Sequence, residues 1–160
     1  MGIKQYRVDN RMLHGQVITA YGRSYAIDEY IVVNEETSKN DLQISLLEMA
    51  AMMATVRVVS PKELVEIVKT NDLKGTSTLV VFKEIEDAVE SAENGLTMDA
   101  LQIGGMFSRE GRDRKKYDVA LFADEQDKAA FRKLEDMNVD LSFQVVPDYR
   151  AKKLSSLIKY

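Results

Sequence analysis

Short apolar runs rich in β-branched residues alternate with segments of helical spacing along the whole 160-residue sequence. Strands followed by helices of about ten residues predict a mostly parallel, doubly wound sheet with helices on both faces. We therefore expect an α/β fold, a single three-layer α/β/α domain over residues 1–160 with about seven strands. The expected strands are residues 3–8, 29–33, 55–59, 78–82, 100–103, 117–122 and 139–146.

Helix boundaries follow from capping residues and apolar spacing. The clearest start is Ser60-Pro61-Lys62-Glu63, with a serine cap, proline in the first turn and glutamate at the third position. Helices are also expected at residues 16–25 and 84–94, after Asp124, and at residues 151–158. A further helix is expected after Ser38, with Leu42, Leu46, Met49 and Met53 at helical spacing. Its methionine cluster, Met49, Met52 and Met53, is expected to fill the core.

Composition limits the function classes. Hydrophobic residues make up 45% of the sequence and charged residues 30%, as in ordinary soluble globular proteins. The net charge of −4 argues against nucleic-acid binding, and no membrane-spanning run or signal peptide is found, so we expect a cytoplasmic protein. Without cysteine, and with one histidine, neither thiolate chemistry nor a histidine-rich metal site is available. We expect no metal and no cofactor, and the lack of a Walker loop argues against ATP as a phosphoryl donor.

The only histidine, His14, lies in residues 7–17, Arg-Val-Asp-Asn-Arg-Met-Leu-His-Gly-Gln-Val. This stretch joins the first expected strand to the first expected helix, at the sheet edge where α/β proteins bind ligands. Arg7, Asp9 and Arg11 precede the imidazole, and a helix start offers free backbone N–H groups to an anion. A nucleophilic nitrogen beside two guanidinium groups can hold a phosphoryl group. The alternative is a structural histidine packed beside its apolar neighbours.

Other loops are expected to meet this histidine. Right-handed crossovers place every strand-to-helix loop at one edge of the sheet. The loops that should converge on His14 contain residues 34–36, Ser60, Lys83 and residues 104–106. Within the last, paired glycines either form a turn or let backbone amides approach a phosphate. The charged loop at residues 109–116 is expected to be a solvated face, with docking to an acidic partner surface as the alternative.

Residues 7–17 resemble the phosphorylation-site sequence of IIB proteins of the mannose/fructose/sorbose family of bacterial sugar phosphotransferase systems. The family pattern is Arg-Ile-Asp-Asp-Arg-Leu-Ile-His-Gly-Gln-Val, and seven of the eleven residues are the same. Leu-Gln-Ile-Gly-Gly-Met at residues 101–106 resembles the family's Val-Asn-Ile-Gly-Gly-Met, and the resemblance extends along nearly the whole chain. The departures are Asn10, where Asp is commoner, Tyr21, near a position where many relatives carry Trp, and Met52-Met53-Ala54 in place of a proline-containing link.

The resemblance implies that a IIA protein or domain carrying phosphohistidine phosphorylates His14, in this family on Nδ1. The phosphoryl group would then pass to a hexose or amino sugar held by membrane-embedded IIC and IID partners. Arg11, with Arg7, would neutralise the phosphate, and Asp9 would orient the imidazole or hold an arginine. The remaining phosphate-binding or partner-binding residues are expected to be Leu13, Gly15, Gln16, Ser60, Gly104 and Gly105.

Two alternatives stay open on the sequence. The same fold could be a non-catalytic binding module that senses a phosphorylated metabolite and leaves His14 unmodified. A phosphohistidine mutase is the weaker alternative, because a second catalytic histidine is expected there and the sequence has one. For the same reason, the IIA function is expected on a separate polypeptide. The sequence identifies neither the sugar nor the oligomeric state, and a homo-oligomer is one of the states it allows.

Overall fold

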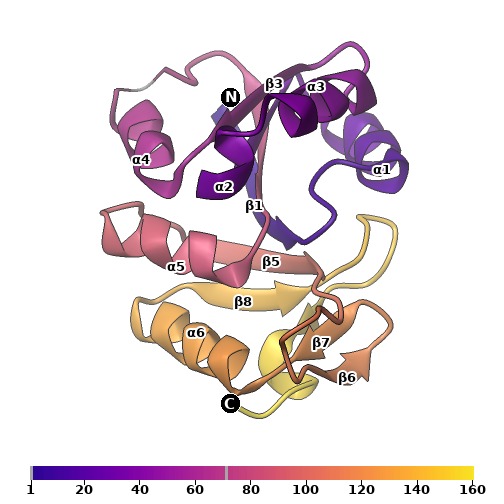
Figure 1. The fold of residues 1–160 in the computed structure, drawn as a ribbon, viewed down its shortest axis with the longest axis vertical. Helices are drawn as coiled ribbons and strands as arrows, with labels where there is room; N and C mark the ends of the chain where they lie inside the picture. The colour runs from indigo at the N-terminus through magenta and orange to yellow at the C-terminus, as the bar shows by residue number, and fades with distance from the viewer. Residues whose placement is uncertain (1, 71) are drawn as a thin grey trace.

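The computed structural model describes residues 2–70 and 72–160. The strands of its main sheet are β1 Gly2–Asp9, β2 Glu29–Val33, β3 Thr55–Val59, β4 Ser77–Phe82, β5 Ala100–Gly105, β8 Asp140–Phe143 and β9 Lys152–Lys153. They lie in the order β3-β2-β4-β1-β5-β8-β9 (Figure 1). Every neighbouring pair is parallel except β8 and β9, which confirms the expected α/β fold with a mostly parallel, doubly wound sheet.

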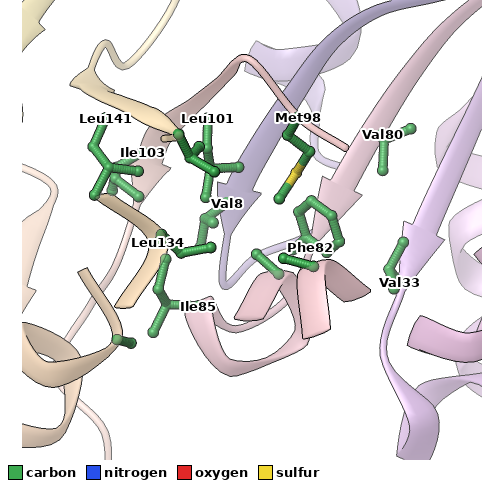
Figure 2. Close-up of a cluster of buried hydrophobic side chains, with 14 of the residues drawn as sticks. Val8, Val33, Val80, Phe82, Ile85, Met98, Leu101, Ile103, Leu134 and Leu141 are labelled. Carbon is green, nitrogen blue, oxygen red and sulfur yellow. The ribbon is translucent and has the colours of Figure 1, made fainter. Parts of the chain in front are cut away.

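Helices cover both faces of this sheet. They are α1 Gly15–Tyr25, α2 Glu35–Ser38, α3 Asp41–Ala50, α4 Pro61–Lys69, α5 Ile85–Glu93 and α6 Glu125–Asp136. On one face α1 and α3 pack over a small core that includes Val17 and Leu47. On the other face α4, α5 and α6 cover a larger core around Val8, Phe82 and Ile103 (Figure 2). Within the described residues, no helix combines the length and the apolarity needed to cross a membrane.

Side-chain caps begin several of the helices. Ser60 accepts a hydrogen bond from the Glu63 N–H, and the Glu63 carboxylate accepts one from the Ser60 N–H, which confirms the predicted start of α4. The helix expected after Ser38 is α3, but Asn40 caps it in place of Ser38, and a separate short helix, α2, begins at the Asn34 cap before it. Asparagine is a strong N-cap residue, so each begins a helix of its own.

Two expected elements are wrong. Residues 117–122 form no strand of the main sheet, because they are divided between β6 (Lys115–Asp118) and β7 (Leu121–Ala123), an antiparallel hairpin. Residues 151–158 form β9 and a 3-10 turn, Leu154–Ser156 (η1), in place of a helix. The pairing of β9 with β8 and the burial of Leu154 outweigh the helical tendency of so short a segment.

The expectation that the methionine cluster fills the core is also wrong. α3 packs on the sheet through Leu47, and Met49 is exposed on its outward side. Met52 and Met53 lie in the turn after this helix and are exposed as well. The apolar spacing correctly predicts a helix, but it does not determine which side of that helix is buried.

Candidate active site

The first strand brings the histidine to the carboxyl edge of the sheet. Asp9 ends β1 and α1 begins at Gly15, so residues 10–14 connect the two elements. The Met12 N–H donates to the Asp9 carbonyl oxygen at 2.9 Å, and a positive φ of 61° at Met12 turns the chain. His14 occupies the N-cap position of α1 with an extended backbone. The histidine therefore lies between strand and helix, as the sequence predicts.

The buried carboxylate of Asp9 holds the imidazole. His14 Nε2 lies 3.0 Å from Asp9 Oδ2, and the His14 side chain is 20% exposed. Burial by itself favours a higher pKa of Asp9, but hydrogen bonds from His14 and Arg11 and the charge of Arg7 hold this pKa below its ordinary value. An ionised carboxylate only accepts hydrogen bonds, so Nε2 carries the imidazole proton and Nδ1 keeps a lone pair. In the neutral imidazole, Nδ1 is therefore the ring nitrogen that is free to act as a nucleophile.

Arg11 is the guanidinium that reaches solvent beside this imidazole. Its Nε and Nη2 donate to the two carboxylate oxygens of Asp9 at 3.1 and 3.2 Å, and its backbone N–H donates to Oδ1 at 3.0 Å. The guanidinium lies over the Phe107 ring, 4.8 Å from the ring centroid. The side chain is 38% exposed. Asp9 thus fixes Arg11 next to His14 while part of the cation stays open to an incoming anion.

Arg7 lies behind Asp9 and is fully buried. Its Nη1 donates to the Tyr21 hydroxyl at 2.7 Å and to the Gln144 carbonyl oxygen at 2.9 Å, and its Nη2 donates to the Val145 carbonyl oxygen. Nη2 also lies 3.6 Å from Asp9 Oδ2. The expected contact of Arg7 with a phosphate is wrong, because the side chain does not reach the surface. Arg7 instead links Asp9 to Tyr21 and to the segment that follows β8.

The two glycines at the end of β5 leave room for these charged side chains. An added Cβ on Gly104 would lie 1.9 Å from the guanidinium carbon of Arg7. One on Gly105 would lie 2.8 Å from Asp9 Oδ1 and 2.8 Å from Phe107 Cε2. Both distances are well inside van der Waals contact, and neither glycine has a positive φ. Space for Arg7 and Asp9, rather than a turn, therefore requires glycine at these positions.

Asn10 joins three loops at this edge, a role that was missed in the sequence. Its side-chain amide donates to the Lys83 carbonyl oxygen at 2.7 Å and to Glu84 Oε2 at 3.1 Å. Its Oδ1 accepts from the backbone N–H of Phe107 at 2.8 Å. An aspartate could donate to neither oxygen, so asparagine suits a position beside Glu84. The signal for this role in the sequence was that asparagine stands at position 10, where Asp is commoner in the family pattern.

The other predicted residues are divided between this site and the rest of the edge. Gly15 and Gln16 are exposed at the start of α1 beside His14, whereas Leu13 is buried in the small core. Ser60 is not brought to the histidine, because β2 and β4 separate β3 from β1. Three strand spacings amount to roughly 14 Å, and the Ser60 hydroxyl is engaged in capping α4. Ser60 therefore lies outside the site.

The charged loop at residues 109–116 is not simply a solvated face, so that expectation is wrong for two of its arginines. Arg112 donates to Asp124 at 2.5 and 2.9 Å and to Asp127 at 3.0 Å. Arg114 is buried and donates to Asp127 at 2.9 and 3.1 Å. Its Nη1 also donates to the Phe107 carbonyl oxygen at 2.9 Å. These arginines link the start of α6 to Phe107, whose ring lies under the Arg11 guanidinium.

Two hollows border Gln16 on the surface beside the histidine. One, of about 680 Å³, is lined by residues of α1 and by Tyr149. The other, of about 530 Å³, includes Val119, Phe143 and Tyr149. In the part of the chain that the structure describes, no cluster of three or more histidine or carboxylate side chains is placed to hold a metal ion. This edge brings together an imidazole, a partly exposed cation and the amides of a helix start, a combination that suits an anionic group.

Comparisons with known proteins agree with this geometry. A family model described as the sorbose subfamily IIB component of the PTS system matches residues 3–160. The sorbose-specific EIIB component of Lacticaseibacillus casei is 31% identical over 141 residues, which cover 88% of this chain and 85% of that protein. The mannose-specific EIIAB component of Escherichia coli K12 is 27% identical over 153 residues, 95% of this chain but 47% of that protein.

A solved structure extends the similarity to three dimensions. The IIBSor domain of the sorbose permease from Klebsiella pneumoniae superimposes with a TM-score of 0.86 at 27% sequence identity. The match covers 98% of this chain and 95% of that domain. With the family model matching nearly every residue, the chain belongs to the sorbose subfamily of IIB components of the sugar phosphotransferase system.

Proposed function

We propose that His14 is the phosphorylated residue of this IIB component and that its Nδ1 carries the phosphoryl group. The observation that supports this most is the 3.0 Å contact between His14 Nε2 and the ionised carboxylate of Asp9. It engages one ring nitrogen and leaves the other with a free lone pair beside the exposed Arg11. The same residues therefore orient the nucleophile and receive the charge of the phosphate.

The transfer is a displacement at phosphorus. The lone pair of His14 Nδ1 forms a bond to the phosphorus of a phosphohistidine on the IIA partner. The bond from phosphorus to the donor nitrogen breaks, and its electron pair returns to the donor imidazole. Asp9 stabilises the positive charge that His14 gains, and Arg11 with the backbone N–H groups at Gly15 and Gln16 stabilises the phosphoryl oxygens. Catalysis then rests on positioning and electrostatics, as is usual for phosphoryl transfer.

The second transfer delivers the group to a sugar. A sugar hydroxyl oxygen forms the new bond to phosphorus, the bond from phosphorus to His14 Nδ1 breaks, and the hydroxyl proton is released. The sorbose-specific and mannose-specific relatives support a hexose as the acceptor. We place this step at membrane-embedded IIC and IID partners, on the inner side of the membrane, where uptake and phosphorylation are coupled.

Phosphorylation can be tested directly on the purified chain. After incubation with phosphoenolpyruvate, the general phosphotransferase proteins and IIA, intact-mass measurement should show one added phosphoryl group, lost in acid. Nitrogen-15 NMR of the sole imidazole should assign that group to Nδ1. His14→Gln should stay unmodified. Binding of a phosphorylated metabolite with no covalent change would favour the sensing module instead, and an acid-labile modification of His14→Gln would refute the assignment.

Arg11→Ala is expected to slow phosphoryl transfer far more than it changes stability. One positioned donor to a developing anion contributes about 3 kcal/mol, or roughly a hundredfold in rate. Arg11→Lys should recover only part of this loss, because a two-pronged donor becomes a point charge. Rapid-quench measurement of transfer from phosphorylated IIA checks both variants, with Arg23→Ala on the exposed side of α1 as the control. A parental rate in Arg11→Ala would remove Arg11 from the mechanism.

Gly105→Ala is expected to act on the histidine through Asp9. The new methyl group would press on Asp9 Oδ1 and on the Phe107 ring, and so displace the carboxylate that holds His14. We expect transfer to fall at least tenfold, since small misplacements at a reacting centre are costly, on the order of a hundredfold for 1 Å. Thermal melts and transfer rates on one preparation separate this from simple destabilisation. A lower melting temperature with an unchanged rate would leave Gly105 with a packing role alone.

A further inference from the structure

An apolar stripe runs along the outward side of α3 and continues into the turn after it. Five large side chains form it, and we call them the α3 surface: Leu42, Leu46, Met49, Met52 and Met53, which are 71%, 56%, 76%, 81% and 97% exposed. The first three are spaced by four and three residues, so they share one side of the helix. Large apolar side chains exposed together on a folded protein are typical of an interaction site.

Acidic side chains accompany the α3 surface. Residues 35–54 contain four carboxylates and one ammonium group, and Lys39 lies 2.6 Å from Glu35. Asp41 and Glu48 are exposed on α3 itself. A second copy of this chain, packed α3 against α3, would bring like charges together, and an anionic lipid surface would be repelled as well. The charge therefore fits a partner that is both apolar and basic.

The α3 surface begins at the same edge of the sheet as His14. α3 follows β2 through α2, so its first turn, with Leu42, lies toward the carboxyl edge where β1 ends. α1 and α3 also share one face of the sheet, packed over the same small core (Figure 1). A partner bound along α3 would thus lie on the face of the sheet that α1, the helix following His14, also covers.

We propose that the α3 surface binds a basic, apolar segment on the cytoplasmic side of the membrane-embedded partner that holds the acceptor sugar. The proposal rests on the proposed function. Cytoplasmic loops of membrane proteins carry an excess of Lys and Arg, which complements the carboxylates around α3. An amphipathic segment of such a loop can lay its apolar side along the stripe, as helices do in apolar grooves. This contact docks the carrier and takes no part in the chemistry at His14.

The test measures the two transfers separately. Leu46→Gln with Met49→Gln removes apolar contact without a change in charge, and Met137→Gln at the end of α6 is the matched control. The rate of transfer from IIA to His14 should be the same in the parent, the double variant and the Met137→Gln control. In inside-out vesicles that contain the membrane partners, sugar phosphorylation by the double variant should show a KM for the carrier raised at least about tenfold, with kcat unchanged.

A charge reversal tests the electrostatic part. Glu48→Lys should raise the same KM, and the difference from the parent should shrink at high salt. Glu66→Lys on α4 makes the same charge change on the opposite face and should have no effect. Both sites are exposed, so thermal melts should match the parent.

Several results would overturn the docking proposal. One is a parental KM in both α3 variants while His14 is phosphorylated normally. Another is that the parent sediments as a dimer and the double variant as a monomer, while that KM stays the same. The surface would then join two copies of the chain. A third is that the parent binds protein-free anionic vesicles and the double variant loses this binding as fully as it loses binding to vesicles with the membrane partners. Failure of IIA to phosphorylate the parent would instead refute the proposed function.

Discussion

Gly104→Ala is expected to destabilise the fold by about 4 kcal/mol, the scale seen when a buried charge loses its partners. The added methyl group would lie 1.9 Å from the Arg7 guanidinium carbon, and Arg7 is fully buried. To relieve the clash, Arg7 must leave the Gln144 and Val145 carbonyl oxygens or the Asp9 carboxylate. Domains of this size are stabilised by only about 5–15 kcal/mol, so much of the folding free energy would be lost.

Urea denaturation measures this loss, and the chain offers a matched control. Gly22→Ala places a methyl group in open space within α1, and it should stabilise the protein by about 1 kcal/mol because alanine favours a helix. A double-mutant cycle with Arg7→Ala adds a sharper check. Once the Arg7 side chain is removed, Gly104→Ala should cost almost nothing more, since the two changes act on one contact. Additive losses would show that Gly104 is needed for a different reason.

Asp9→Asn is expected to reduce phosphoryl transfer on the order of ten-thousandfold, as in other sites where an amide replaces the carboxylate behind a catalytic imidazole. The amide can donate a hydrogen bond to His14 Nε2, which would move the imidazole proton to Nδ1 and remove the nucleophilic lone pair. Arg11 would lose its two-oxygen acceptor. Arg7, buried and 3.6 Å from this carboxylate, would keep its charge without its counter-ion, so stability should fall as well.

Two measurements separate the effects of Asp9→Asn. Nitrogen-15 shifts of the single imidazole report the tautomer: the parent should have the proton on Nε2, and the variant should shift toward Nδ1. Single-turnover transfer from phosphorylated IIA, at a temperature where the variant is folded, reports the chemistry. Asp136→Asn, an exposed carboxylate at the end of α6, is the control. A folded variant with an unchanged tautomer and a parental rate would show that Asp9 does not orient the histidine.

The sequence by itself determined the architecture and indicated the residue that we propose as the phosphoryl acceptor. Alternating apolar runs and helical segments are local patterns, and they predict parallel strands with helical crossovers wherever the chain repeats them. The start of α4 was predictable for the same reason, because Ser60 and Glu63 cap it within four residues. The position of His14 between β1 and α1 was predictable as well, because the strand and the helix on either side of it are local patterns. Its resemblance to a family pattern added the chemistry.

Only the tertiary structure decided what the two arginines of this stretch do. Arg7 and Arg11 are alike in the sequence, but Arg7 is buried by acceptors 137 and 138 residues away, Gln144 and Val145. Gly104 likewise appeared to be a turn or phosphate-binding residue until the side chain beside it was known. Local spacing carries no information about such distant partners. The burial of Arg7, and the exposure of the apolar stripe on α3, depend on which surfaces meet when the layers pack.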